Sequence, residues 1–516
     1  MSLSQPLLSQ STTSSRARSS LIRYYPESYN GTGDEESDDE YTGGPSEVLL
    51  FSRPPADASV LFKDPLERQP KDALFALLFA GAMLAFVVAA VNAVRIAKHE
   101  DGEELRKTVY AAFKNCAGVL VGVSAASVLA GICWIMAMSA FVRPIVWGSI
   151  CAIPVLCLAL FTFILTDALL GKSNDPVYLE PQYNGMIILS FVFLIASFVS
   201  GAFLYKERRN IDKAINIIHL ACQILWETPS IFTLSLGIMG IYAVFSFSWA
   251  FAFSHLFLSR DPTAPPSESI TTSTEGAILF FIFIHFWFTA VLSSIEKMTI
   301  AGVVGQWYFG RAIDETYDED LVTKSLKGSL GPGFGSICFA SLVVAAVEVT
   351  QFVIRTIRKN SRGRPSSAFL ALLDSCMDCT SRAISQISSY TLIYCGITGA
   401  SVCEGAMSCT RLFRRNLVVG MATAGITRTL LFLGASAAAG GVGAGTFFYA
   451  ARGVGSPYAW VVGSVGAFVP FYVVRFMSQI IQNTVDATFI CYMLDVDSNA
   501  NNCQEAHEIF ENELGI

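Results

Sequence analysis

The sequence predicts an all-α integral membrane protein that crosses the bilayer about ten times. Of its 516 residues, 53% are hydrophobic and 15% are charged, and the mean hydropathy is +0.49. In a typical soluble domain, about a quarter of the residues are charged. The charges are also segregated, so that long uncharged stretches alternate with short charged connections. The uncharged stretches reach about 20 residues, the length that a helix needs to cross ~30 Å of hydrocarbon.

Ten stretches without Asp, Glu, Lys or Arg have this length, and we expect each to be one spanning helix. Helices are favoured over barrel strands because a strand needs only about 9–11 residues that alternate between apolar and polar. The buried helix of a soluble core explains a single stretch but not ten in series. The ten stretches are residues 73–94, 115–142, 144–166, 181–205, 228–259, 276–295, 328–347, 383–403, 429–451 and 453–474.

Three regions differ in composition from these stretches. Residues 1–70 are rich in Ser, Pro, Gly and acidic residues, so we expect a mostly disordered cytoplasmic tail before a ten-helix domain at 71–494. Residues 495–516 are expected to be a cytoplasmic C-terminal tail. Residues 206–227 carry apolar residues at helical spacing behind a basic cluster, which is typical of an amphipathic helix on an anionic membrane surface. These apolar positions are Ile211, Ala214, Ile215, Ile218, Cys222 and Leu225.

Lys and Arg in the short connections indicate which side is cytoplasmic. A cytoplasmic N-terminus leaves slightly more basic residues inside than outside. The main exception is the connection after stretch 328–347. Either this connection is external, or stretches 328–347 and 383–403 do not both cross the membrane fully. The basic residues concerned are Arg355, Arg358, Lys359, Arg362, Arg364 and Arg382.

Six short segments, in a fixed order, resemble one known family. They are Lys327–Leu330 with Gly335–Leu342, Thr299–Gly302 with Trp307–Phe309, Lys63–Arg68, and Val485–Tyr492. Together they are similar to the choline transporter-like family (solute carrier family 44), over roughly residues 60–500. Residues 95–114 are short and lack both Cys and an Asn-x-Ser/Thr sequon, which resembles the compact fungal, plant and protist members rather than the animal ones.

The resemblance implies a ten-span carrier of choline or, in some members, ethanolamine. It also implies a multi-pass protein of the plasma membrane with both termini cytoplasmic, surrounded by membrane lipids. We therefore expect a transporter that moves a small organic cation by alternating access. An ion channel and a membrane-embedded protein of lipid metabolism are the alternatives, although neither a repeated filter sequence nor a cluster of intramembrane histidines is found.

A choline site needs aromatic faces, because a quaternary ammonium donates no conventional hydrogen bond and is attracted to π-systems. Stretches 228–259 and 276–295 offer Tyr242, Trp249, His285 and Trp287 near mid-depth. The alternative is that these rings pack against neighbouring helices or face lipid.

Charged residues within the stretches require a reason, because each costs about 2.5–3.5 kcal/mol on insertion scales. Glu348 follows an uncharged stretch and is our candidate for attracting a cation; the alternative is a structural ion pair with Arg428 or Arg475. Glu296 and Lys297 are adjacent, so on a helix they point about 100° apart and need not pair.

Small residues in stretch 429–451 suggest close helix packing or a hinge, with Gly441 and Gly445 at four-residue spacing. No enzymatic activity, cofactor or metal is expected. The glycines of Gly331–Gly335 lack the Lys-Ser/Thr of a phosphate loop, and no basic face suggests nucleic acid, so neither nucleotide nor nucleic acid is an expected partner.

Overall fold

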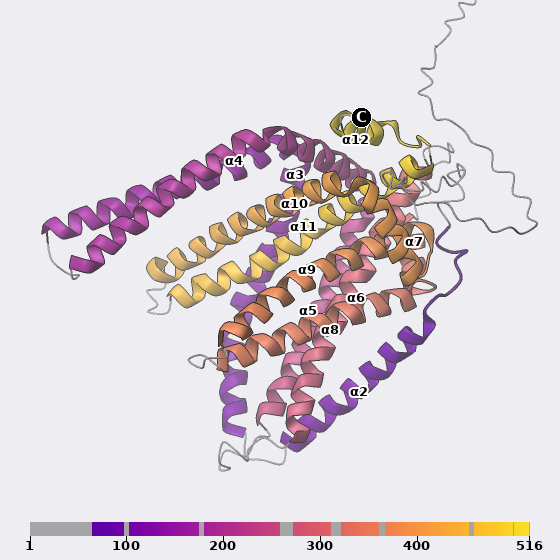
Figure 1. The fold of residues 1–516 in the computed structure, drawn as a ribbon. Coiled ribbons are helices and arrows are strands. Elements are labelled where there is room, and N and C mark those ends of the chain that lie inside the picture. Colours follow the sequence, from indigo (N-terminus) through magenta and orange to yellow (C-terminus); the bar gives the residue numbers. More distant parts are fainter. Residues whose placement is uncertain are drawn as a thin grey trace, which may run out of the picture. The chain divides into compact units, whose positions relative to one another are not determined.

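The computed structural model describes residues 64–97, 103–174, 180–258, 272–310, 321–360, 367–453, 459–498 and 500–514. Every regular element in these ranges is helical, which confirms the all-α class (Figure 1). The elements are α2 (Ala73–Ala97), α3 (Glu103–Asn174), α4 (Glu180–Glu227), α5 (Ser230–Leu258), α6 (Thr272–Gly310), α7 (Leu321–Leu330), α8 (Phe334–Asn360), α9 (Ser367–Thr398), α10 (Val402–Phe448), a π-helical turn (Tyr449–Gly453), α11 (Ala459–Ser498) and α12 (Gln504–Leu514).

Within the described residues, 7 helices are long and apolar enough to cross a membrane, or up to 8 when a bent pair is counted as one span. The polytopic class is thereby confirmed, and the number ten stays a prediction. The bent pair is Asp374–Thr398 with Val402–Arg414, at 105° to one another. The chain turns there at Gly399, whose φ of +71° is a left-handed conformation that glycine adopts without steric cost. Stretch 383–403 is therefore a broken helix.

Two of the ten predicted stretches share the single long helix α3. They are 115–142 and 144–166, and the helix is broken between its two halves at Phe141, where φ is −130° and ψ is 38°. Pro144 explains the break, because its ring lacks an N–H and collides with the carbonyl four residues earlier. The position of the break matches the boundary that charge patterning placed at Arg143.

Helix α6 lies inside the bundle, among six other helices. It packs against α2, α5, α7, α8, α9 and α11. Its C-terminal half is almost entirely buried, with Ile300, Ala301 and Val303 at 0% exposure. Close approach of α9 is possible because Gly396 has no side chain; a Cβ there would lie 2.8 Å from the Met298 carbonyl oxygen. Residues on α6 are therefore held by neighbours on every side.

The predicted surface helix at 206–227 is the continuation of α4. Its six apolar positions, Ile211 to Leu225, are at most 5% exposed, and all of them except Ala214 belong to the main core. They face protein, since α4 contacts α3, α10, α11 and α12. This corrects the interpretation of the stripe as a lipid-facing surface: helical periodicity shows that one face is buried, but does not show what covers it. Whether the opposite face lies at the membrane surface stays a prediction.

Residues 64–72, which we call the strap, run across the ends of two helix pairs. Arg68 Nη2 donates to the Ile397 carbonyl at 3.1 Å, at the C-terminus of α9. Asp72 accepts a 2.9 Å hydrogen bond from Ser336 near the start of α8. Arg68 is 9% exposed, and burial lowers the pKa of its guanidinium to about 10, so it is charged at neutral pH.

Within the predicted tail, Pro65 and Arg68 are buried against the helices, and residues 1–63 lie outside the described chain. A polar composition did not reveal this, because the partners of Arg68 are carbonyl groups left unpaired at a helix end more than 300 residues away.

The C-terminal residues also pack against the bundle. Asp495 is fully buried and accepts hydrogen bonds from the Tyr308 hydroxyl at 3.1 Å and from the Asn502 backbone N–H at 2.9 Å. Ala506 and Phe510 of α12 are buried in the same core. The predicted tail at 495–516 thus contains a docked helix.

The basic connection that violated the orientation rule is partly neutralised. Arg355 lies 3.5 Å from Asp374 and 2.5 Å from Asp378, and Arg358 lies 2.5 Å from Asp374. Gln351 contacts Asp378 as well. Since each of these arginines has an acidic partner on α9, their positive charge is a weaker orientation signal than their number suggests.

Candidate functional site

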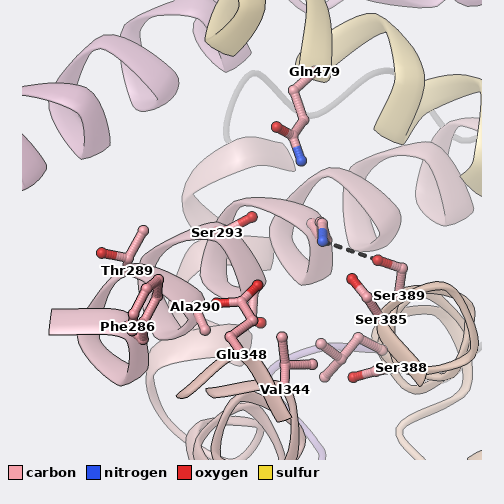
Figure 2. A pocket seen from close by; sticks show the side chains of 13 residues that line it. Phe286, Thr289, Ala290, Ser293, Val344, Glu348, Ser385, Ser388, Ser389 and Gln479 are labelled. Atoms are coloured by element: carbon pink, nitrogen blue, oxygen red, sulfur yellow. Dashed lines mark hydrogen bonds between the residues drawn. The ribbon is translucent and has the colours of Figure 1, made fainter. Parts of the chain in front are cut away.

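A cavity of about 240 Å³ lies between α6, α8, α9 and α11 (Figure 2). Helix α6 contributes residues spaced three or four apart on one face, from Phe286 to Lys297, and α9 does so from Ser385 to Leu392. Side chains at this spacing share a face of a helix. Six of the lining residues carry hydroxyl groups: Thr289, Ser293, Ser294, Ser385, Ser388 and Ser389.

Small hydroxyl residues leave the cavity open and polar. Large apolar side chains at the same positions would fill the space between the helices. Gln479 reaches toward it from α11 and adds an amide (Figure 2). Phe286 supplies one aromatic ring. The cavity is therefore a hydrophilic chamber in the middle of apolar helices.

Glu348, one turn after Val344 on α8, lines this chamber. Among the described residues it forms neither a hydrogen bond nor an ion pair. Its charged neighbour is Lys297, at electrostatic rather than contact range. Arg475 instead lies over the Phe432 ring, with its guanidinium carbon 5.9 Å from the ring centroid. The structural ion pairs of Glu348 with Arg428 or Arg475 are thus not formed in the described chain.

Lys297 is the second charged residue of the cavity, and it was not among the predicted site residues. Its Nζ donates to Ser389 Oγ on α9 at 2.9 Å. The preceding Glu296 is 0% exposed and accepts a 2.7 Å hydrogen bond from Ser235 on α5. The two neighbours therefore face different helices, as their rotation on α6 predicts. One sequence signal for Lys297 was overlooked: Phe286, Thr289, Ser293 and Lys297 are spaced three or four residues apart, which places the lysine on the same helix face as two hydroxyl residues.

Three of the four predicted aromatic residues come together elsewhere, between α5 and α6. The His285 ring lies 4.5 Å from the Trp249 ring and 6.3 Å from the Tyr242 ring, measured between centroids. Trp249 also donates to the Phe281 carbonyl at 2.8 Å. None of the three lines the cavity. Their role in binding stays a prediction.

Trp287 is held in the core between α2, α6 and α8. It is 1% exposed, and its Nε1 donates to the Cys338 carbonyl at 3.3 Å. Its ring meets Phe79 edge-on at 5.1 Å. The adjacent residue, Phe286, faces the cavity instead. A shift of one residue on a helix thus separates a cavity ring from a packing ring.

The predicted glycines of α10, Gly441 and Gly445, lie apart from a close contact between α10 and α11. A Cβ added to Gly441 or Gly445 would meet nothing within 4 Å. The close approach of α10 to α11 is at Gly443, where an added Cβ would lie 2.5 Å from the Ala467 Cβ. The packing role therefore belongs to Gly443, and a hinge role of Gly441 and Gly445 stays a prediction.

The chamber offers a carboxylate, an ammonium, hydroxyl groups and one aromatic face. A carboxylate without a protein partner attracts a cation, and hydroxyl groups exchange hydrogen bonds with a polar solute. The arrangement suits a small, water-soluble molecule with a positive charge. It lies within helices long enough to cross a membrane.

Comparison with known proteins gives one consistent result. A family model described as plasma-membrane choline transporter matches residues 191–497, which include all four cavity helices except the last residue of α11. A CTL-like protein of Dictyostelium discoideum is 23% identical over 420 residues, covering 76% of this chain and 73% of the relative.

Two further relatives match with shorter coverage. The choline transporter-like protein ctl1 of Schizosaccharomyces pombe is 22% identical over 69% of this chain and 61% of its own length. Choline transporter-like protein 2 of Danio rerio is 26% identical over 46% of this chain and 35% of its own length. The alignments thus span less than two thirds of these two relatives.

Proposed function

Because the chain belongs to the choline transporter-like family, we propose that it carries choline or a similar small organic cation across a membrane, with the α6–α8–α9–α11 cavity as its binding site. The family is one of membrane transporters, and the apolar helices make the chain a multi-pass membrane protein. Ethanolamine is the second substrate that we propose. The proposed location is the plasma membrane, with both termini cytoplasmic.

The observation that carries the proposal is the unpartnered carboxylate of Glu348 in the cavity. A charged side chain within a membrane is costly, and it usually faces a polar pathway or a partner. An organic cation supplies the missing charge. Its methyl groups fit against Phe286, Val344 and Leu392, and the hydroxyl of choline finds partners among the serines of α9.

Ties at the two ends of these helices support alternating access as the proposed mechanism. On one side, the strap joins the α7–α8 turn to the α9–α10 turn through Asp72 and Arg68. On the other side, Arg355 and Arg358 of α8 pair with Asp374 and Asp378 of α9. A carrier of this design opens one tie at a time, so that the cavity never connects both sides. A channel would leave both ends open together.

The test is uptake of labelled choline by liposomes that contain the purified full-length chain. We expect saturable uptake that an inside-negative potential accelerates. A monovalent cation gains about 2.3 kcal/mol per 100 mV, which corresponds to roughly 50-fold accumulation. Flux that does not saturate would indicate a channel. Absence of flux, with turnover of the lipid headgroups, would reject transport in favour of lipid metabolism.

A further inference from the structure

Two opposite charges share the cavity without touching one another. Lys297 enters from α6 and Glu348 from α8, and each lies within electrostatic range of the other. Among the described residues, no ion pair within 4 Å joins them. Lys297 is instead bound to the Ser389 hydroxyl on α9 at 2.9 Å (Figure 2). The carboxylate is therefore open to a cation from outside.

A carrier that works without a coupling ion must also cross back empty. In that state an exposed Glu348 would be an uncompensated charge inside the membrane. Lysine suits the task of covering it, because its ammonium is a compact charge with three donors on a flexible four-carbon stem. Such a side chain reaches partners on more than one side by rotation about its own bonds.

We propose that Lys297 is a tethered cation that pairs with Glu348 while the empty carrier crosses back, and that rests on Ser389 when the carrier is open to accept an organic ammonium. The inference rests on the proposed function. It assigns the arrangement seen in the structure, with Lys297 on Ser389 and Glu348 free, to the state that accepts substrate. It also explains why a cation carrier has a positive side chain in its binding site.

The other charges near Lys297 have partners of their own. Glu296 is bound to Ser235 on α5, and Asp486 of α11 accepts a 2.9 Å hydrogen bond from Gln482. Arg428 of α10 also acts on Lys297 electrostatically. If Lys297 had a purely structural role, its charge would stabilise these buried carboxylates. Its loss would then reduce net uptake and exchange alike.

The deciding experiment compares net uptake with exchange in proteoliposomes. Net uptake of labelled choline requires the empty carrier to return, whereas exchange against choline loaded inside does not. For Lys297→Met, we expect net uptake to fall about tenfold or more, while exchange stays within about twofold of the wild type and choline binds more tightly. Lys297→Arg, which keeps the charge, restores part of the net uptake.

Ser389→Ala is the second variant and removes the hydroxyl on which the ammonium rests. We expect Lys297 to stay on Glu348, so that choline binds more weakly. Equal loss of net uptake and exchange in Lys297→Met, or unchanged net uptake, would overturn the proposal. If the wild type carries choline in neither mode, the proposed function itself fails, which is a separate result.

Discussion

Lys297 of α6 and Ser389 of α9 are joined by a hydrogen bond of 2.9 Å across the wall of the cavity. The bond holds an ammonium in the same chamber as the carboxylate of Glu348. It also joins two helices through residues that lie 92 positions apart in the chain. The chemistry of the candidate site therefore depends on how α6, α8 and α9 meet.

Glu348→Gln removes the charge of the cavity carboxylate while keeping its shape. We expect choline uptake to fall about tenfold or more, mainly through a higher KM, because an interaction with a charged group contributes about 1.5–3 kcal/mol. Uptake by proteoliposomes measures the change. The matched control is Glu508→Gln on the exposed face of α12, which should leave uptake unchanged. An unaltered KM in Glu348→Gln would remove this residue from the site.

Trp287→Ala should act on stability rather than on binding. The side chain is 1% exposed, and truncation of a buried aromatic residue costs about 3–5 kcal/mol. We expect a clear loss of thermal stability in detergent, whereas Trp287→Phe should be milder because it keeps a ring. The protein that survives should bind choline with the same affinity. A weaker affinity in well-folded Trp287→Ala alone would instead support a cation–π role.

Arg68→Met tests the strap. Its guanidinium binds the carbonyl of Ile397 in a buried position, so we expect a loss of about 1.5–3 kcal/mol in the free energy of unfolding. Lys71→Met is the matched control, since the Lys71–Glu404 pair is exposed and such pairs contribute about 0–1 kcal/mol. Thermal unfolding of both variants gives the comparison. Equal effects would mean that Arg68 is not the main anchor of the strap.

Gly443→Ala and Gly441→Ala separate packing from hinge motion in α10. A methyl group at Gly443 would press on Ala467 and on the Gly463 carbonyl, so we expect a destabilisation of about 1–3 kcal/mol. At Gly441 the same change meets open space and should be neutral or stabilising. Slower transport by a fully stable Gly441→Ala would identify a hinge, whereas an unchanged rate would exclude one.

Some features of the site could be predicted from the sequence and others could not. Glu348 was found because a charge next to an apolar stretch is rare and costly. Lys297 was not selected, although it is also charged, because it lies beside Glu296 at the end of a stretch. The serines of α9 carried no signal, since hydroxyl residues are common within spanning helices. Trp287 was a predicted site residue and its neighbour Phe286 was not, because a sequence shows where a ring lies along a stretch, whereas rotation about the helix axis decides which ring faces a cavity.

The sequence by itself determined the class of the protein: uncharged stretches of spanning length form helices because a helix satisfies all of its backbone hydrogen bonds within one segment in lipid. It also located the break in α3, since Pro144 acts on its own helix. Only the tertiary structure decided what each helical face meets. The apolar stripe of residues 206–227 packs against protein, and Arg68 binds the end of a helix that is distant in the chain. Lys297 and Glu348 line the same cavity. Local patterns record that a face is buried or polar, whereas its partner depends on how helices far apart in the chain pack together.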